Sequence, residues 1–255
     1  MKLHKITISG ANEHTDIKEL IALTGRYYQT SGLDIELGVQ MSPTKAFYNS
    51  DRYQWLMELH QQAFDANHAR IDVALHVNPG WVEQVCVGVF PLEIIKFMGF
   101  CGRGGIYVQR IQLNFLIGRE EAPDMEKLYW VIREFGSHQF ILTYNEANRN
   151  FIQEFYRRYG KCFHLLVDES HGKDKTPEKW QPVVFPGVFQ AYSGGLSPDN
   201  IEQALDNIAG INTPDIWIGI DAEGKLKGDD GHLSLAKADA FMQKVQEWYQ
   251  KNTQS

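Results

Sequence analysis

The hydrophobic pattern of the chain is a succession of short apolar runs that end at small, acidic or amide residues. Runs bounded in this way predict buried β-strands. Eight strands are predicted, at residues 2–8, 33–39, 70–76, 108–114, 140–144, 165–167, 189–192 and 216–220. Buried strands that stop at Asp or Gly and then lead into a helix are typical of a parallel α/β barrel.

Amphipathic segments between the apolar runs predict the helices. Trp55, Leu56 and Leu59, for example, share one face of a helix. Ser197 followed by Pro198 predicts a helix start, with Ser as the N-cap and Pro at the first helical position. Helices are predicted at residues 15–24, 53–66, 81–85, 91–98 and 148–159, after residue 197, and at residues 236–249.

Strands and helices alternate regularly along the whole chain, without a linker or a low-complexity segment. This order predicts an α/β fold, a single (β/α)8 TIM barrel with residues 1–255 as one domain. In such barrels, residues that follow strands lie at the catalytic face, and loops that precede strands lie at the opposite face. The barrel prediction therefore decides which polar residues are candidates for chemistry.

Composition narrows the class of protein. The chain has 255 residues, of which 43% are hydrophobic, enough for one large core. A net charge of −7 argues against nucleic-acid binding. The sequence has neither a signal-peptide pattern nor an apolar run of the roughly 18 residues that a membrane span needs. Three cysteines without CxxC spacing indicate a reducing compartment, so we expect a cytoplasmic protein that does not bind membranes.

Polar residues follow most of the predicted strands. They are Ser9, Gln40, His76, Asn78, Gln112, Asn114, Tyr144, Asn145, Asp168, Ser193 and Asp221. Asp168 is the best candidate for a general acid or base, because a carboxyl group at the mouth of a closed pocket is liable to a raised pKa. The alternative is that Asp168 caps the next helix or pairs with Lys173 or Lys175. For the lone His76, a structural role in the core is the favoured interpretation.

The glycine pair Gly194–Gly195 follows the seventh predicted strand and precedes the helix start at Ser197. Backbone amides after such a pair, aimed by a helix N-terminus, can bind phosphate without Lys or Arg. Gly224 follows the eighth strand and can complete the same site, since barrels often bind phosphate after strands seven and eight. The alternative is a tight strand–helix junction that needs Gly for its geometry.

Other patterns argue for no further site. The Gly-rich stretch at residues 101–105 precedes the fourth strand, so we expect a turn at the face opposite the site. No cluster of His, Asp and Glu has the spacing of metal ligands, and no G-x-S-x-G, Walker or G-x-G-x-x-G motif follows the expected strands. The sequence therefore predicts neither a metal nor a cofactor.

Several of these stretches together resemble a known family. Three stretches look like phosphoribosylanthranilate isomerase, the barrel enzyme of tryptophan biosynthesis. They are SGGLSPDN at residues 193–200, LLVDE at residues 165–169, and a last strand that ends in Asp and Gly. The resemblance extends to ITISGAN, where the family reads K-I-C-G-L-T, and to RIQLNF, where it reads V-Q-L-H-G. It is closest to a divergent, isomerase-like branch of the family.

The resemblance implies a barrel of the ribulose-phosphate-binding type and an Amadori rearrangement of a phosphoribosylamine to a phosphoribulosylamine. This aldose–ketose isomerisation, an intramolecular oxidoreduction, uses a general acid, a general base and a phosphate site. Carried over by position, the acid is Asp168. The residues implied for binding substrate and its phosphate are Ser193, Gly194, Gly195, Asp221, Gly224, Gln112 and Asn114.

The chain departs from the family most clearly at the base. The family uses the Cys of K-I-C-G, and Ser9 stands at that position. A serine hydroxyl, unlike a thiol, needs a neighbouring base to activate it, and His76 is the imidazole best placed for this. Asn114 replaces the family's His after the fourth strand, and Phe47, close to Arg52, falls where the family has Arg. The interval from Asp to Gly after the eighth strand is one residue shorter than in the family.

Two hypotheses from different classes follow. The first is an isomerase that acts on a phosphorylated sugar derivative, with Asp168, Ser9 and His76 as catalytic residues. The second is a non-catalytic barrel that keeps the Gly-Gly phosphate site and binds a small phosphorylated metabolite. Aldolase and epimerase chemistry is disfavoured, because no Lys ends a central strand and no metal cluster is apparent. Either hypothesis allows a monomer or a homodimer.

Overall fold

The computed structural model describes residues 1–31, 33–66, 70–100, 105–118, 121–168, 173 and 175–253. Eight parallel strands pair in sequence order, and the last pairs with the first to close a barrel. The strands are β1 (Lys2–Ser9), β2 (Asp34–Met41), β3 (Ile71–Val77), β4 (Ile106–Leu113), β5 (Gln139–Tyr144), β6 (His164–Val167), β7 (Gln190–Ser193) and β8 (Trp217–Ala222). The structure is therefore a (β/α)8 barrel, as the apolar pattern predicted.

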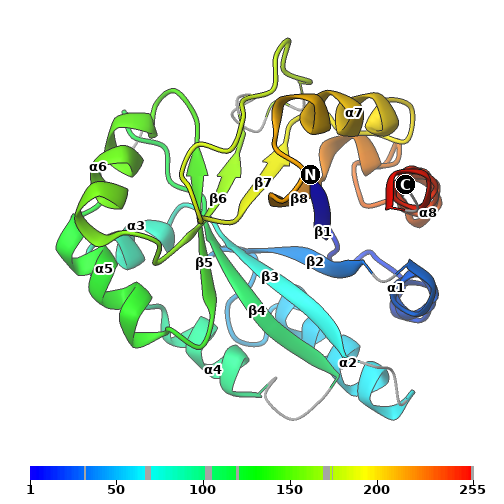
Figure 1. Cartoon of the computed structure of the whole chain (residues 1–255). Coiled ribbons are helices and arrows are strands. Elements are labelled where there is room, and N and C mark those ends of the chain that lie inside the picture. The colour runs from blue at the N-terminus through cyan, green and yellow to red at the C-terminus, as the bar shows by residue number, and fades with distance from the viewer. Residues whose placement is uncertain are drawn as a thin grey trace.

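Helices surround the barrel (Figure 1). They are α1 (Ile17–Ser31), α2 (Asp51–Asp65), α3 (Val82–Cys86), α4 (Leu92–Phe100), α5 (Met125–Glu134), α6 (Arg149–Tyr159), α7 (Ile201–Ile211), α8 (Leu235–Thr253) and the 3₁₀ turn η2 (Gly224–Leu226). Outward-facing strand residues such as Ile6, Ile8 and Leu75 are buried beneath the helices. This shell of apolar contacts is the main source of stability for such a fold.

The alternation is less regular than the sequence predicted. Both α3 and α4 lie between β3 and β4, whereas the described residues between β6 and β7 contain no helix. That connection is rich in Pro and Lys and lacks an apolar repeat of helical period. It covers the barrel instead through side chains: Phe185 is buried and stacks on Tyr156 of α6, with ring centroids 4.5 Å apart.

Helix α5 lies in a segment for which the apolar pattern predicted no element. Its signals are clear in retrospect: Leu128, Val131 and Ile132 share the buried face, and Asp124 caps the N-terminus by accepting from the amides of Glu126 and Lys127, both at 3.0 Å. The sequence therefore carries the ordinary signals of a helix in this segment, although no helix was predicted there.

The predicted start of α7 is also wrong. The helix begins at Ile201 with Asn200 as its N-cap, not at Pro198 with Ser197 as its N-cap. The carbonyl of Ser197 accepts from the amides of Asn200 and Ile201, at 3.2 and 3.1 Å, so residues 197–200 form a turn that leads into the helix. The Asn200 side chain closes this turn, because its Oδ1 accepts from the Ser197 amide at 2.9 Å.

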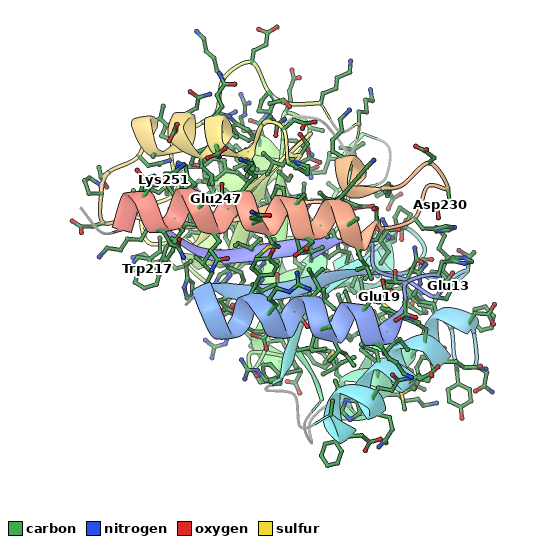
Figure 2. The ribbon with its side chains drawn as sticks, turned by 90° about the vertical axis from the view of Figure 1, so that its right-hand side faces the viewer. Glu13, Glu19, Trp217, Asp230, Glu247 and Lys251 are labelled. Atoms are coloured by element: carbon green, nitrogen blue, oxygen red, sulfur yellow. The ribbon has the colours of Figure 1, made fainter. Side chains whose placement is uncertain are left out.

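The C-terminal helix α8 connects the first helix of the chain to the last part of the barrel. It packs against α1 on one side and α7 on the other, and Figure 2 shows α8 and α1 running side by side. Asp239 of α8 accepts from Tyr27 of α1 at 2.6 Å, and Trp248 donates to Asp206 of α7 at 2.7 Å. Within the described part of the chain, no helix has both the length and the apolarity to cross a membrane.

The barrel interior carries charge beneath the site. Arg110 of β4 forms a buried ion pair with Glu36 of β2 and donates to Thr7 at 2.9 Å. Burial by itself would raise the pKa of Glu36, but Arg110 and Lys5 outweigh this effect and hold that pKa below its usual range. The Glu36 carboxylate is therefore charged inside the barrel and satisfied by its partners.

Candidate active site

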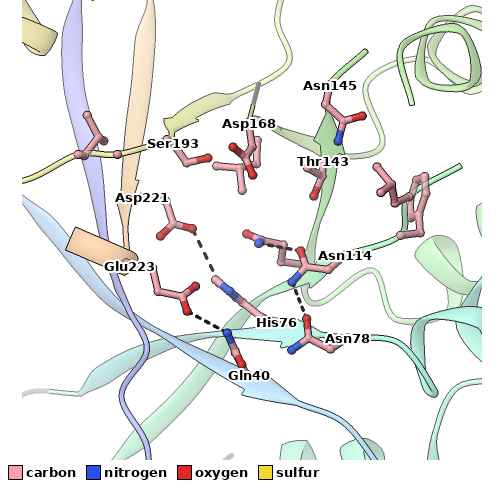
Figure 3. Close-up of a pocket in the computed structure, with 18 of the residues that line it drawn as sticks. Gln40, His76, Asn78, Asn114, Thr143, Asn145, Asp168, Ser193, Asp221 and Glu223 are labelled. Carbon is pink, nitrogen blue, oxygen red and sulfur yellow. Dashed lines mark hydrogen bonds and ion pairs between the residues drawn. The ribbon is translucent and has the colours of Figure 1, made fainter. Parts of the chain in front are cut away.

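A cavity of ≈ 440 Å³ opens at the C-terminal ends of the strands, where parallel barrels hold their active sites (Figure 3). Every strand from β2 to β8 contributes to its lining, so the site is built from side chains far apart in sequence. The volume suits a small metabolite such as a phosphorylated pentose. The predicted residues that line it are His76, Gln112, Asn114, Asp168, Ser193, Gly194, Gly195, Asp221 and Gly224.

Ser9 lies just below this lining and is connected to it by a hydrogen bond to Asp221. Its hydroxyl donates to Oδ1 of Asp221 at 2.7 Å, and both side chains are buried. The other carboxyl oxygen, Oδ2, is 4.0 Å from Nε2 of His76. Figure 3 shows the His76 ring pointing toward the Asp221 carboxyl group across the cavity floor. Residues from β1, β3 and β8 thus form one cluster, which we call the Asp221 cluster: Ser9, His76 and Asp221.

Gly38 of β2 makes room for this cluster. Its register partner is Ser9, and a Cβ added to Gly38 would lie 2.0 Å from Ser9 Oγ and 2.9 Å from the His76 ring. Distances this short are not tolerated between non-bonded atoms, so a larger residue would push Ser9 and His76 apart. Glycine is required here by the close approach of two polar side chains.

Burial changes the protonation of both titratable members of the Asp221 cluster. It raises the pKa of Asp221 to about 7, with a further contribution from Glu223 and an opposing one from the Ser9 hydrogen bond. Burial lowers the pKa of His76 to about 4, so this imidazole is neutral near pH 7. Nε2 of His76 is buried without a hydrogen-bond partner among the described residues. The cluster therefore holds a carboxyl group that can both give and take a proton near neutrality.

The glycine pair lines the cavity directly after β7. Gly194 and Gly195 have φ angles of 114° and 60°, which favour glycine. The carbonyl of Gly195 accepts from the Asn200 side chain at 2.8 Å and from the Thr176 hydroxyl at 3.3 Å. Gly224 lines the same cavity from the start of η2. These two hydrogen bonds fix the conformation of the turn, and Gly224 lines the same cavity. A site that binds an anion through backbone amides needs a fixed conformation of this kind.

Asp168 projects from the end of β6 into the cavity, on the side away from the His76 ring (Figure 3). The last register pair of β6 and β7 joins Val167 to Tyr192, the residues directly before Asp168 and Ser193, and the register partner of Ser193 on β8 is Asp221. Strands in a sheet are about 4.8 Å apart, so two strand steps separate the backbones of Asp168 and Asp221 by about 10 Å. The two carboxyl groups therefore face a ligand from different sides.

The rim beside the Asp221 cluster is closed by an ion pair. Glu223 accepts from Nζ of Lys227 at 3.1 Å and from Nε2 of Gln40 at 2.9 Å. Arg52, five residues after Phe47, is buried, pairs with Glu13 and donates to the Gln40 carbonyl at 3.0 Å. Phe47 is 47% exposed and does not line the cavity. The cations nearest this rim are therefore already paired.

Carboxamides line the wall opposite. Nε2 of Gln112 donates to Oδ1 of Asn114, and Nδ2 of Asn114 donates to Oδ1 of Asn78, both at 2.9 Å. Asn145 of the β5–α6 loop and Thr143 of β5 extend this wall. The four carboxamides were candidates from the sequence and Thr143 was not. The hydrogen-bonded chain of Gln112, Asn114 and Asn78 depends on the barrel bringing β3 and β4 together.

Two charged lining residues were absent from the candidate set. Glu223 and Lys227 follow β8 by one and five residues and enter the cavity only because η2 turns the chain back over it. Of the Gly-rich stretch at residues 101–105, the first four residues lie outside the described residues, and Gly105 directly precedes β4 at the opposite end of the barrel. The described residues contain no group of three or more His, Cys, Asp and Glu side chains arranged to hold a metal.

Comparison with known proteins rests on structure, because no family model and no curated protein matches the sequence. The chain is similar to TrpF from Jonesia denitrificans, with 16% identity and a TM-score of 0.56 over 96% of this chain and 98% of that one. It is similar to a phosphoribosylanthranilate isomerase in complex with reduced 1-(o-carboxyphenylamino)-1-deoxyribulose 5-phosphate, with 14% identity and a TM-score of 0.54 over 96% and 99%. A putative spore coat polysaccharide biosynthesis protein E from Chromobacterium violaceum reaches a TM-score of 0.58 at 13% identity, over 97% of this chain and 75% of that one. In fold, the chain resembles the phosphoribosylanthranilate isomerases over nearly its whole length.

Proposed function

We propose that the protein is an isomerase that converts a phosphorylated aldosylamine into the corresponding ketose by an Amadori-type rearrangement. One observation carries the proposal: a rigid glycine turn suited to phosphate shares a cavity with two carboxyl groups that face the ligand from different sides. The fold is that of an isomerase captured with a ribulose 5-phosphate derivative, which supports a ligand of the same class.

The reaction needs two proton movements on the sugar. An acid protonates the furanose ring oxygen, the C1–O bond breaks, and the nitrogen lone pair forms an iminium at C1. A base then removes the proton on C2, and the C–H electrons form a C1=C2 bond while the iminium electrons return to nitrogen. Protonation at C1 with loss of the C2 hydroxyl proton gives the ketone, so no atom or electron is gained or lost.

Asp168 is assigned the role of the acid at the ring oxygen. It follows β6 and reaches the cavity next to Ser193 and the glycine turn. A phosphate at Gly194 and Gly195 places the sugar between this carboxyl group and the Asp221 cluster. Acid catalysis by a positioned side chain contributes about 10²–10⁴-fold to the rate of such a step.

Asp221 is assigned the role that the thiol has in the related family. Ser9 occupies the position of that thiol, but it is buried below the cavity lining, whereas Asp221, to which its hydroxyl donates, lines the cavity. A carboxyl group with a pKa of about 7 is half ionised at neutral pH, and it can accept the C2 proton and then return a proton to C1. Ser9 then acts as a positioning residue, and neutral His76 can hydrogen-bond the C2 oxygen as its charge develops.

The second candidate is a barrel that binds the phosphorylated metabolite without turning it over. The observation that favours it is the serine at position 9, because a family that relies on a thiol loses its base there. This candidate keeps the glycine turn and gives no catalytic role to Asp221.

Incubation with N-phenyl phosphoribosylamine distinguishes the two, with the ketose separated from the aldosylamine by chromatography. The isomerase predicts product formation together with thermal stabilisation by ribitol 5-phosphate but not by ribitol. The binding protein predicts the same stabilisation without product. Failure of every phosphorylated sugar to stabilise the protein would reject both.

A further inference from the structure

The charges of the cavity are divided between its two sides. The carboxyl and amino groups that line it, those of Asp168, Asp221, Glu223 and Lys227, all follow β6 or β8. Among the described lining residues that follow β3, β4 and β5, none carries Asp, Glu, Lys or Arg. That half of the cavity instead presents carboxamides, which Figure 3 shows at Asn78, Asn114 and Asn145. A ligand whose phosphate lies at the glycine turn directs its other end toward this neutral side.

The carboxamides form an ordered relay rather than a set of independent groups. Gln112 donates to Asn114, and Asn114 donates to Asn78, each at 2.9 Å. Oε1 of Gln112 is then left as an acceptor at one end, and Nδ2 of Asn78 is left as a donor at the other. Within the described part of the chain neither atom has a hydrogen-bond partner. Flipping all three amides reverses the relay but again leaves one donor and one acceptor.

The relay offers a free acceptor at one end and a free donor at the other, and an amide can pair with either end because it carries both a donor and an acceptor. A carboxylate offers acceptors only, so it cannot form a hydrogen bond with the Gln112 oxygen. It would also lose hydrating water at a wall that has no cation to offset the cost of desolvation. Among the described residues that line the cavity, Lys227 is the one cation, and it pairs with Glu223 on the other side. Leu116 and Pro79 border the relay and offer apolar contact to the frame that carries the amide.

We propose that the substrate carries a neutral amide group, either a carboxamide or the amide edge of a ring, at the end remote from its phosphate. The inference rests on the proposed function for the placement of the phosphate and goes beyond it in naming the chemical class of the amine part. It separates this protein from an isomerase whose substrate carries a carboxylate at that end.

Three stable open-chain ligands test the inference on the full chain: 1-(2-carbamoylphenylamino)-1-deoxyribitol 5-phosphate, its 2-carboxyphenyl counterpart and its unsubstituted phenyl counterpart. Titration calorimetry at pH 7.5 is expected to give the carbamoyl ligand a Kd at least about tenfold below those of the other two. A carboxyphenyl or phenyl ligand that binds as tightly as the carbamoyl ligand overturns the inference.

Ribitol 5-phosphate separates failure of the inference from failure of the proposed function. If it binds and the carbamoyl group adds nothing, only the amide inference falls. If no phosphorylated ligand binds, the proposed function falls and the inference falls with it. Asn78→Ala is expected to abolish the preference for the carbamoyl ligand while leaving the Kd of ribitol 5-phosphate unchanged. Asn150→Ala, at an exposed position on α6, is the matched control and is expected to leave both values unchanged.

Discussion

Ser9 donates its hydroxyl hydrogen to Asp221 over 2.7 Å, and this bond joins the first strand of the barrel to the last beneath the cavity. The family that the sequence resembles has a thiol at the position of Ser9. In this chain the residue there is a donor, and the group that it orients is a buried carboxyl with a pKa of about 7. In our proposal the base is therefore Asp221 at the end of β8, and not the residue at the end of β1.

Removal of the Ser9 hydroxyl tests this relationship. Since its hydrogen bond lowers the pKa of Asp221, Ser9→Ala should raise that pKa, and the acid limb of the kcat/KM profile should shift upward by about 0.5–1 pH unit. The measurement is a pH–rate profile of isomerisation from pH 5.5 to 9. Ser137→Ala, at an exposed position, is the control. An unshifted profile would show that Ser9 does not act through Asp221.

Replacement of Asp221 should stabilise the fold at alkaline pH. Because burial raises the pKa of Asp221 from 3.8 to about 7, the native state holds a proton between these values and the unfolded state does not. Stability therefore falls as pH rises through this window, and Asp221→Asn removes the loss. Relative to the wild type, the free energy of unfolding of the variant should increase by about 2 kcal/mol between pH 5 and pH 8.

Urea denaturation at the two pH values measures this difference. Asp199→Asn, at an exposed position, serves as the control for the loss of one carboxyl group. A difference between wild type and Asp221→Asn that is the same at pH 5 and pH 8 would contradict the burial of an ionisable carboxyl group at this position.

Asp168 should be needed for turnover but not for binding. Asp168→Asn is expected to lower kcat by about 10²–10⁴-fold, because an amide cannot protonate the ring oxygen. Titration calorimetry should give a Kd for ribitol 5-phosphate within a few-fold of the wild type. Asp199→Asn controls for the loss of one charge. Turnover that survives in Asp168→Asn would remove this residue from the mechanism.

The glycine turn should be specific to the phosphate. Gly195→Ala and Gly160→Ala both place a Cβ on a backbone with positive φ, 60° and 69°, so each should cost about 1–3 kcal/mol of stability. Only Gly195 lines the cavity, whereas Gly160 follows α6 at the other end of the barrel. The Kd of ribitol 5-phosphate should rise at least about tenfold in Gly195→Ala and stay unchanged in Gly160→Ala. Equal effects would assign the glycine a role in folding alone.

The barrel could be predicted from the sequence because its strands are short apolar runs with clear ends. The first strand, for example, was expected at residues 2–8 and spans Lys2–Ser9. The connection between β6 and β7 could not be predicted, since its buried residues, such as Phe185 and Val188, follow no period. Proline-rich segments of this kind pack through individual side chains, and their path depends on the surface that they cover.

The position of the candidate site could be predicted from the sequence. The contacts and pKa values of its residues could be predicted much less well. Parallel strands bring their C-terminal ends together, which places Asp168, His76 and Ser193 in one cavity once the barrel is assumed. The contact between Ser9 and Asp221 joins residues 212 apart in sequence, and its effect depends on burial, which no local pattern encodes. Asp221 was therefore expected to help bind the ligand, whereas its buried position gives it the raised pKa of a proton-transfer group.

Solvent exchange tests the central claim most directly, because it reports the proton transfer itself. Proton NMR can follow deuterium entering C1 of 1-phenylamino-1-deoxyribulose 5-phosphate in D₂O, the exchange expected when the rearrangement runs in reverse. We expect the wild type to catalyse exchange at a rate that rises through about pH 7, as Asp221 ionises, and Asp221→Asn to catalyse none above background. Saturable binding of the ketose without exchange by the wild type, or undiminished exchange by Asp221→Asn, would contradict the account.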